Sequence, residues 1–200
     1  MLPTTTFAVR LVPNLPNILT LSRIVVIPLI VAAFYLPPVT ASWTTFALFA
    51  YASVTDYFDG MLARRWNQTT DVGRFLDPIA DKLLVAAVLV MMIATEVISG
   101  AAIIAVLLIL LRELLVSGLR EFLAGKQVDV PVSRLAKWKT GVQLVAIALL
   151  LLTGVAPEIG AFGAVLLWVA TVLTVYTGYE YLCGGIAHMT RPRGDDPAAE

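Results

Sequence analysis

Four aspartates, each pair separated by a single helical turn, are the residues best suited to chemistry in this 200-residue chain. Asp56 and Asp59 are three residues apart and Asp77 and Asp81 are four apart, so each pair projects from one face of a helix. Each pair can therefore bind one cation. Carboxylates without histidine or cysteine favour a hard ion such as Mg²⁺ or Mn²⁺. Two such ions about 4 Å apart can neutralise a diphosphate and polarise the bond that is to break.

Small residues lie between the aspartates at positions where a close approach would be useful. Gly60, Ala63 and Gly73 allow a nucleotide or another helix backbone to come near, although ordinary helix packing would explain these three residues if they stood alone. An alternative for the aspartates is salt bridging at helix ends with Arg64, Arg65, Arg74 and Lys82. The complete pattern is Asp56-x2-Asp59-Gly60-x2-Ala63-Arg64-x8-Gly73-x3-Asp77-x3-Asp81.

A second charged cluster is predominantly basic and follows later in the chain. Arg112 and Arg120 are eight residues apart and so share one helical face, while Lys137 and Lys139 open the next apolar segment. These four side chains could converge on an anion, which favours an acceptor that itself carries a phosphate. Positive charge flanking a membrane span, in contact with lipid headgroups, is the alternative. The cluster also contains Glu113, Glu121, Lys126 and Arg134.

The elements that must position these residues are membrane helices. The chain is 59% hydrophobic, above the roughly 45–50% that is usual for soluble domains. Six apolar stretches are long enough to cross a bilayer, so we predict an all-α integral membrane protein with six transmembrane helices and a polar cavity facing the cytoplasm. Residues 1–190 are expected to form a single domain and residues 191–200 a disordered polar tail. The stretches lie near 17–36, 41–64, 76–97, 100–123, 136–154 and 159–183.

Charged side chains inside membrane helices are energetically costly. An aspartate at the centre of a membrane helix costs about 2.5–3.5 kcal/mol, so such residues normally face a polar cavity and serve a function. If the helices near 41–64 and 76–97 are antiparallel neighbours, their two aspartate pairs lie at the same depth and surround one cavity. The pattern thus predicts a metal site made by two helices.

The basic residues also predict an orientation. The connections near 37–41, 96–100 and 154–159 contain no lysine or arginine, and all 14 basic residues lie elsewhere. Because cytoplasmic loops are the ones enriched in Lys and Arg, both termini and the site are expected on the cytoplasmic side. Zero formal net charge gives no indication of a nucleic-acid partner, and a single cysteine excludes an intrachain disulfide.

The aspartate pattern resembles the signature of the CDP-alcohol phosphatidyltransferase family at every fixed position. The resemblance implies that two metal ions bind Asp56, Asp59, Asp77 and Asp81, and that Asp81 is the general base for the acceptor hydroxyl. It also implies a homodimer. The nucleotide-binding residues that it implies are Asp56, Asp59, Gly60, Ala63, Arg64 and Gly73.

Four further segments resemble the phosphatidylglycerophosphate synthase branch of that family: residues 16–23, residues 75–82, residues 112–113 with 119–121, and residues 137–140. The resemblance implies CDP-diacylglycerol as donor and sn-glycerol 3-phosphate as acceptor, with phosphatidylglycerol phosphate and CMP as products. A bacterial cytoplasmic membrane is the expected location. Thr20 and Arg23 are further candidates for the cavity, although packing or snorkelling explains them equally well. Trp138 departs from the branch, in which a smaller residue is expected.

Other functions fit parts of the pattern. The same chemistry with phosphatidylglycerol, inositol phosphate or serine as acceptor would preserve the aspartates and change the basic cluster. A cation transporter would use the aspartates as a permeation site, but it would not need Gly60, Ala63 and Gly73 at fixed offsets. A purely structural scaffold would leave aspartates in membrane helices without a role.

Overall fold

The residues that the structure describes form six α-helices and no strand, which confirms the all-α prediction. The computed structural model describes residues 15–66, 71–125 and 134–190, with side chains for residues 21–56, 76, 78–125, 135 and 138–186. Each predicted apolar stretch corresponds to one helix. The helices are α1 (Leu15–Ala33), α2 (Pro38–Trp66), α3 (Asp71–Ala94), α4 (Ala102–Gly125), α5 (Arg134–Leu151) and α6 (Pro157–Thr190).

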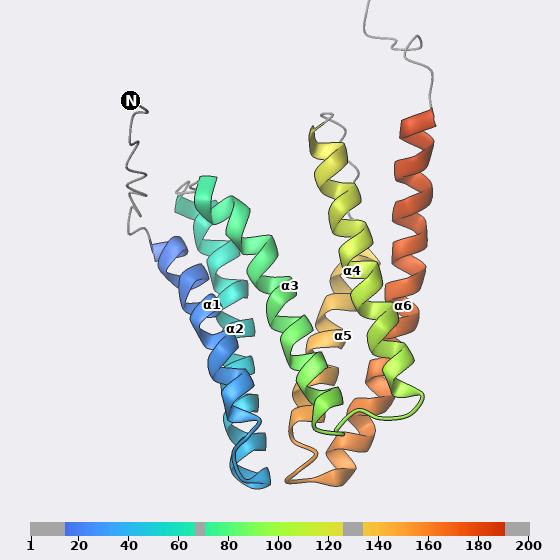
Figure 1. Cartoon of the computed structure of the whole chain (residues 1–200). Helices are drawn as coiled ribbons and strands as arrows, with labels where there is room; N and C mark the ends of the chain where they lie inside the picture. The colour runs from blue at the N-terminus through green and yellow to red at the C-terminus, as the bar shows by residue number, and fades with distance from the viewer. Residues whose placement is uncertain (1–14, 67–70, 126–133, 191–200) are drawn as a thin grey trace, which may run out of the picture.

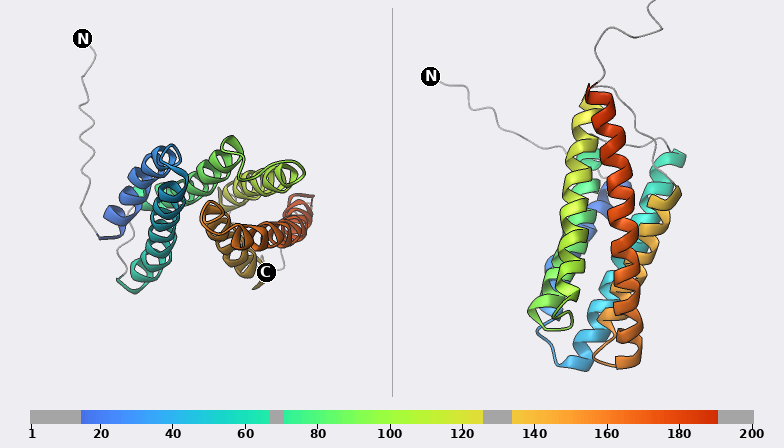
Figure 2. Two further views of the ribbon diagram at one scale, coloured as in Figure 1. Left: turned by 90° about the horizontal axis from the view of Figure 1, so that it is seen from below. Right: turned by 90° about the vertical axis from the view of Figure 1, so that its right-hand side faces the viewer.

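The helices form two groups of three that lie side by side (Figures 1 and 2). In the first group α1 packs against both α2 and α3, and in the second α6 packs against both α4 and α5. The groups meet less extensively, through α2 with α5 and α3 with α4. Successive helices run antiparallel, as the short connections predict. We call the end where α1, α3 and α5 begin the site end; it is at the top of Figure 1.

Short turns close the opposite end of the bundle. Between α3 and α4 the chain reverses direction through Glu96 and Gly100, whose φ angles are 60° and 57°. This left-handed conformation costs a glycine little, because it has no Cβ, but a glutamate adopts it rarely. Several threonine hydroxyls within the helices donate to the carbonyl four residues earlier, such as Thr171 to Leu167 at 2.8 Å, whereas the buried Oγ1 of Thr174 has no partner among the described residues.

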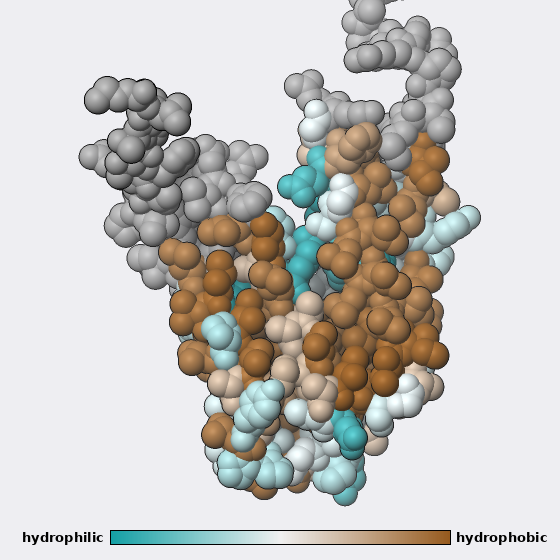
Figure 3. All heavy atoms as spheres, viewed as in Figure 1, coloured by the Kyte–Doolittle hydropathy of each residue, from teal (hydrophilic) through white to brown (hydrophobic). Residues whose placement is uncertain are grey.

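The outer surface of the second helix group is apolar. On α4, Leu111, Leu114 and Leu115 are 56%, 66% and 58% exposed, and Figure 3 shows hydrophobic side chains over most of the visible height. Among the described side chains, two helical segments, Ala102–Gly125 and Pro157–Ile186, are long and apolar enough to cross a membrane by length and composition. Exposed apolar surface of this extent is stable against lipid chains rather than water.

A shared apolar core stands directly below the charged residues. On four helices one turn separates the core from a charged side chain, as from Val26 to Arg23 on α1 and from Leu84 to Asp81 on α3. The core therefore fixes the depth and rotation of the site residues. Its members include Ile30, Phe49, Val88, Leu89, Met92, Val106, Ile109, Ala146, Ile147, Leu150 and Leu167.

Candidate active site

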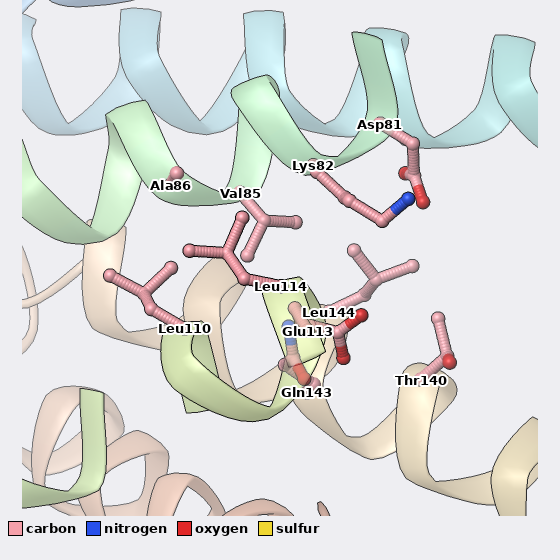
Figure 4. A pocket seen from close by; sticks show the side chains of 10 residues that line it. All are labelled: Asp81, Lys82, Val85, Ala86, Leu110, Glu113, Leu114, Thr140, Gln143 and Leu144. Atoms are coloured by element: carbon pink, nitrogen blue, oxygen red, sulfur yellow. The ribbon is translucent and has the colours of Figure 1, made fainter. Parts of the chain in front are cut away.

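A pocket of about 160 Å³ lies where α3, α4 and α5 converge. Figure 4 shows Asp81 and Lys82 on its α3 wall, with Glu113, Thr140 and Gln143 from the second helix group facing them. Hydrophilic side chains are also visible in the groove between the two groups in Figure 3. The pocket is thus polar along part of its wall and apolar along the rest, which consists of Val85, Ala86, Leu110, Leu114 and Leu144.

Asp56 is held by an arginine from another helix. Arg23 of α1 is fully buried, and its Nη1 lies 2.7 Å from Oδ1 of Asp56 on α2. A charge removed from water in this way needs a partner, so this ion pair accounts for Arg23 better than snorkelling does. The prediction that Arg23 belongs to the polar interior is consistent with this burial. The Asp56 side chain is 43% exposed and can therefore contact a further group.

Asp81 connects the aspartates to the basic cluster. It lies within electrostatic range of Asp56, Arg23 and Glu113. The neighbouring Lys82 ammonium donates to the Pro78 carbonyl at 3.0 Å, within its own helix. Asp81 lines the pocket, and Arg23 of α1, Asp56 of α2 and Glu113 of α4 are close enough to act on its charge.

Several predicted site residues have helical backbones in the structure, but their side chains lie outside the described residues. Asp59, Gly60, Ala63 and Arg64 follow Asp56 along α2 in this way. Gly73 and Asp77 precede Asp81 on α3, Thr20 precedes Arg23 on α1, and Lys137 precedes Lys139 on α5.

The two aspartates whose side chains are described, Asp56 and Asp81, are of a residue type that binds divalent metal ions. Asp56 and Asp81 supply oxygen ligands of the kind that Mg²⁺ or Mn²⁺ prefers, and both lie at the site end within electrostatic range of each other. Among the side chains described, no group of three or more candidate ligands is found, and that set lacks the side chains of Asp59 and Asp77. The two-ion site thus remains a prediction.

Glu113 binds two members of the predicted acceptor site. Its Oε1 accepts a hydrogen bond from Nζ of Lys139 on α5 and a second, at 3.4 Å, from Nη1 of Arg112. Lys139 is 3% exposed, so this carboxylate supplies the countercharge that a buried ammonium needs. The second helix group therefore brings Arg112 and Lys139 together, as the sequence predicts.

Two arginines of α4 rest on α6, which the sequence analysis did not implicate. Nη2 of Arg112 donates to Oγ1 of Thr177 at 3.4 Å, while Nε of Arg112 is buried without a partner in the part of the chain that the structure describes. Arg120 is exposed, with its guanidinium carbon 5.8 Å from the centroid of the Tyr181 ring. This distance is typical of a cation–π contact.

Some site residues were missed from sequence for a physical reason. The charge pattern places Glu113 in the basic cluster without a role of its own, although an acid in an apolar helix is a usable signal of function. Gln143, which is 4% exposed and lines the pocket, carries no charge and so gave no such signal. The sequence gives no signal for Thr177 or Tyr181, because their contacts with Arg112 and Arg120 depend on which face of α6 meets α4.

Comparison with known proteins assigns the chain to a family. The CDP-alcohol phosphatidyltransferase model matches residues 13–176. The chain belongs to the CDP-alcohol phosphatidyltransferase family. This family membership confirms the resemblance read from the spacing of the four aspartates, all of which lie inside the matched range.

Relatives in this phosphatidyltransferase family match over nearly their whole length. A Rickettsia felis protein is 48% identical over 175 residues, which cover 86% of this chain and 95% of the relative. A Pectobacterium atrosepticum protein is 43% identical over 173 residues, covering 84% and 93% respectively. A Shigella flexneri protein is 43% identical over 190 residues, covering 88% and 97%. All three are named CDP-diacylglycerol–glycerol-3-phosphate 3-phosphatidyltransferase.

Proposed function

We propose that this chain transfers the phosphatidyl group of CDP-diacylglycerol to sn-glycerol 3-phosphate, giving phosphatidylglycerol phosphate and CMP. The relatives bear the name of this reaction and resemble the chain over more than four fifths of its length. The structural observation that carries the proposal is the pocket in which Asp81 faces the Glu113 end of the basic cluster. Glu113 itself binds Lys139 and Arg112, so the proposed base and the basic cluster lie close together, which suits an alcohol that carries a phosphate.

The aspartates have two duties in this proposal. Asp56, Asp59, Asp77 and Asp81 would hold two Mg²⁺ or Mn²⁺ ions, which neutralise charge on the diphosphate when bound. Asp81 takes the proton of the acceptor hydroxyl. At the same time the oxygen of that hydroxyl forms a bond to the phosphorus that carries diacylglycerol. The bond from that phosphorus to the CMP oxygen breaks, and CMP leaves with the electron pair. A positioned carboxylate base typically contributes about 10²–10⁴-fold to such a rate.

The basic cluster would bind the phosphate of the acceptor. A guanidinium has five N–H donors, and the contacts of Arg112 with Glu113 and Thr177 use only two of them, so Arg112 retains donor capacity for an oxyanion. An arginine fork binds phosphate oxygens through two N–H groups. Lys139 adds positive charge nearby, and Arg120 and Lys137 complete the proposed set.

The nucleotide would bind on the other side of Asp81. Asp56, Asp59, Gly60, Ala63, Arg64 and Gly73 form the proposed donor site, by resemblance to the family. All six helices would span the membrane, with the cavity, the site end and both termini on the cytoplasmic side of a bacterial inner membrane. A homodimer is part of the proposal, again by resemblance.

The decisive experiment supplies purified protein with CDP-diacylglycerol and one acceptor at a time. CMP release with sn-glycerol 3-phosphate, and not with serine, inositol phosphate or phosphatidylglycerol, is expected. CMP release with only one of the other acceptors would support the phosphatidyl transfer but exclude sn-glycerol 3-phosphate as the acceptor. A chelator should stop turnover at once, and either Mg²⁺ or Mn²⁺ should restore it; activity that is indifferent to chelation would reject the metal site.

A further inference from the structure

Helix α6 carries no residue of the family signature, yet it supports the arginines of α4. Gly178 is buried at this contact, next to Thr177, whose hydroxyl accepts from Arg112. Tyr181, three residues further along the same face, meets Arg120. One face of α6 therefore contacts both arginines of the proposed acceptor site.

The absence of a side chain at Gly178 is required by Arg112. A Cβ at this position would lie 2.7 Å from Cγ of Arg112 and 3.3 Å from its Nε. Cγ is close to the backbone of Arg112, so the clash cannot be relieved by moving only the flexible end of the side chain. Relief would require a different χ1 angle of Arg112 or a wider separation of α4 and α6.

The position of the guanidinium group depends on this contact. Arg112 is the group of the cluster that keeps an unpartnered buried N–H in the described structure, and its Nη2 reaches Thr177 over 3.4 Å. A change of χ1 would swing the whole guanidinium away from both Glu113 and Thr177. Binding of a phosphate through the arginine fork depends on that direction.

We propose that Thr177 and Gly178 are positioning residues that hold Arg112 toward the acceptor phosphate. The inference rests on the proposed function and extends it, because it makes α6 the back wall of the acceptor site. Thr177 supplies a hydrogen-bond acceptor, and Gly178 supplies the space that the aliphatic part of Arg112 occupies. Neither residue touches the substrate.

The test compares three alanine substitutions on one helix. Gly178→Ala should raise the KM for glycerol 3-phosphate by about tenfold, as expected when one charge-assisted hydrogen bond is weakened. The kcat and the KM for CDP-diacylglycerol should stay within about twofold. Gly184→Ala should behave as wild type, because a Cβ there meets no atom within 4 Å.

Gly185→Ala separates positioning from simple helix packing. A Cβ at Gly185 would lie 2.8 Å from Cδ2 of Leu119, so this variant disturbs the α4–α6 contact without touching Arg112. It is expected to lower thermal stability in detergent and to leave the ratio of the two KM values unchanged. If Gly185→Ala produced the same selective loss of acceptor affinity as Gly178→Ala, the proposal would be overturned.

A double-mutant cycle with Arg112→Ala gives the sharpest answer. Alanine has no Cγ, so Gly178→Ala should change the glycerol 3-phosphate KM by less than about twofold in this background. An undiminished effect would show that Gly178 does not act through Arg112. If Arg112→Ala alone left that KM unchanged, the acceptor assignment in the proposed function would fail. A raised KM in Arg112→Ala with wild-type kinetics in Gly178→Ala would reject only this inference.

Thr177 provides a second variant in case Gly178→Ala does not fold. Thr177→Val removes the hydroxyl at similar volume and should raise the KM for glycerol 3-phosphate by about threefold with kcat unchanged. Thr177→Ser keeps the acceptor oxygen and should restore the wild-type value. Wild-type kinetics in Thr177→Val would contradict the proposal.

Discussion

Glu113 gives the two neighbouring basic residues different tasks. Its contact with Lys139 neutralises a nearly buried ammonium, whereas Arg112 shares its donors between Glu113 and Thr177 and retains a buried N–H without a described partner. Lys139 is therefore chiefly part of the framework of the site. Arg112 is the group that has donor capacity left for an oxyanion.

Asp81→Asn tests the general base at the residue scale. The amide preserves the size of the side chain but cannot accept the acceptor proton, so we expect kcat to fall by at least about 100-fold. Calorimetric titration with CMP in the presence of Mg²⁺ should still detect nucleotide binding. Asp71→Asn, at the first residue of the same helix and at a position that the signature leaves unspecified, is the control. Full CMP release by Asp81→Asn would exclude its role as base.

Glu113→Gln tests the ion pair with Lys139. The substitution leaves a nearly buried ammonium without its carboxylate, which costs about 3 kcal/mol in typical cases. We expect lower thermal stability of the detergent-solubilised protein and a weaker response to glycerol 3-phosphate. Glu121→Gln, at an exposed position eight residues further along α4, should match wild type in both measurements. Equal stability of the two variants would mean that the pair contributes little.

The residue types and spacing predicted which side chains lie near one another, and the roles of these side chains stay predictions. Asp56 and Asp81 lie within electrostatic range of each other, and Arg112 and Arg120, eight residues apart, both meet α6. The pairing of Asp56 with Arg23 could not be predicted, because 33 residues separate them and the pairing depends on how α1 packs. Gly178 was also beyond prediction, since many glycines in membrane helices serve only close packing.

At the scale of elements, apolar length predicted the helices but not their neighbours. The observed ends lie within a few residues of the expected ones for most helices, because proline, glycine and polar residues interrupt each apolar stretch. The sequence does not predict which helices pack against each other. In membrane helices both the buried and the lipid-facing sides are apolar, so hydrophobic periodicity does not reveal which side meets another helix.

Gly163→Ala tests the packing of α5 against α6, the most extensive helix contact in the bundle. A Cβ at Gly163 would lie 3.0 Å from the backbone nitrogen of Leu150, which cannot move without displacing α5. We expect a loss of about 1–3 kcal/mol in unfolding free energy, measured by reversible denaturation in mixed micelles.

The matched control is Gly141→Ala, because it gives the same gain in helix propensity. A Cβ at Gly141 meets no atom within 4 Å, so the variant should be as stable as wild type or slightly more stable. Equal destabilisation of the two variants would contradict the view that close approach at Gly163 holds α5 and α6 together.

At the scale of the whole molecule, charge is sorted between the two ends of the bundle. The turns at 34–37, 95–101 and 152–156 contain no lysine or arginine, whereas the opposite end carries the basic cluster. This distribution supports the proposed orientation, with the site end in the cytoplasm.

Cysteine labelling tests this orientation. In a Cys183→Ser background, Ser99→Cys should react with a membrane-impermeant maleimide in intact cells, because its turn is proposed to face outward. Ala198→Cys should react only after permeabilisation. Labelling of Ala198→Cys in intact cells would mean that the topology is the reverse of the proposed one. Labelling at neither position would require a different arrangement of the last spans.

The length of α6 sets the depth at which the acceptor is held. Gly178 lies 21 residues after Pro157, the first residue of the helix. At about 1.5 Å per residue this distance is about 32 Å, close to the thickness of the hydrocarbon layer. Arg112, which touches Gly178, would then stand level with the lipid phosphates. Glycerol 3-phosphate, which is doubly charged and water-soluble, could then reach Arg112 without entering the hydrocarbon layer, while the acyl chains of CDP-diacylglycerol stay in the leaflet.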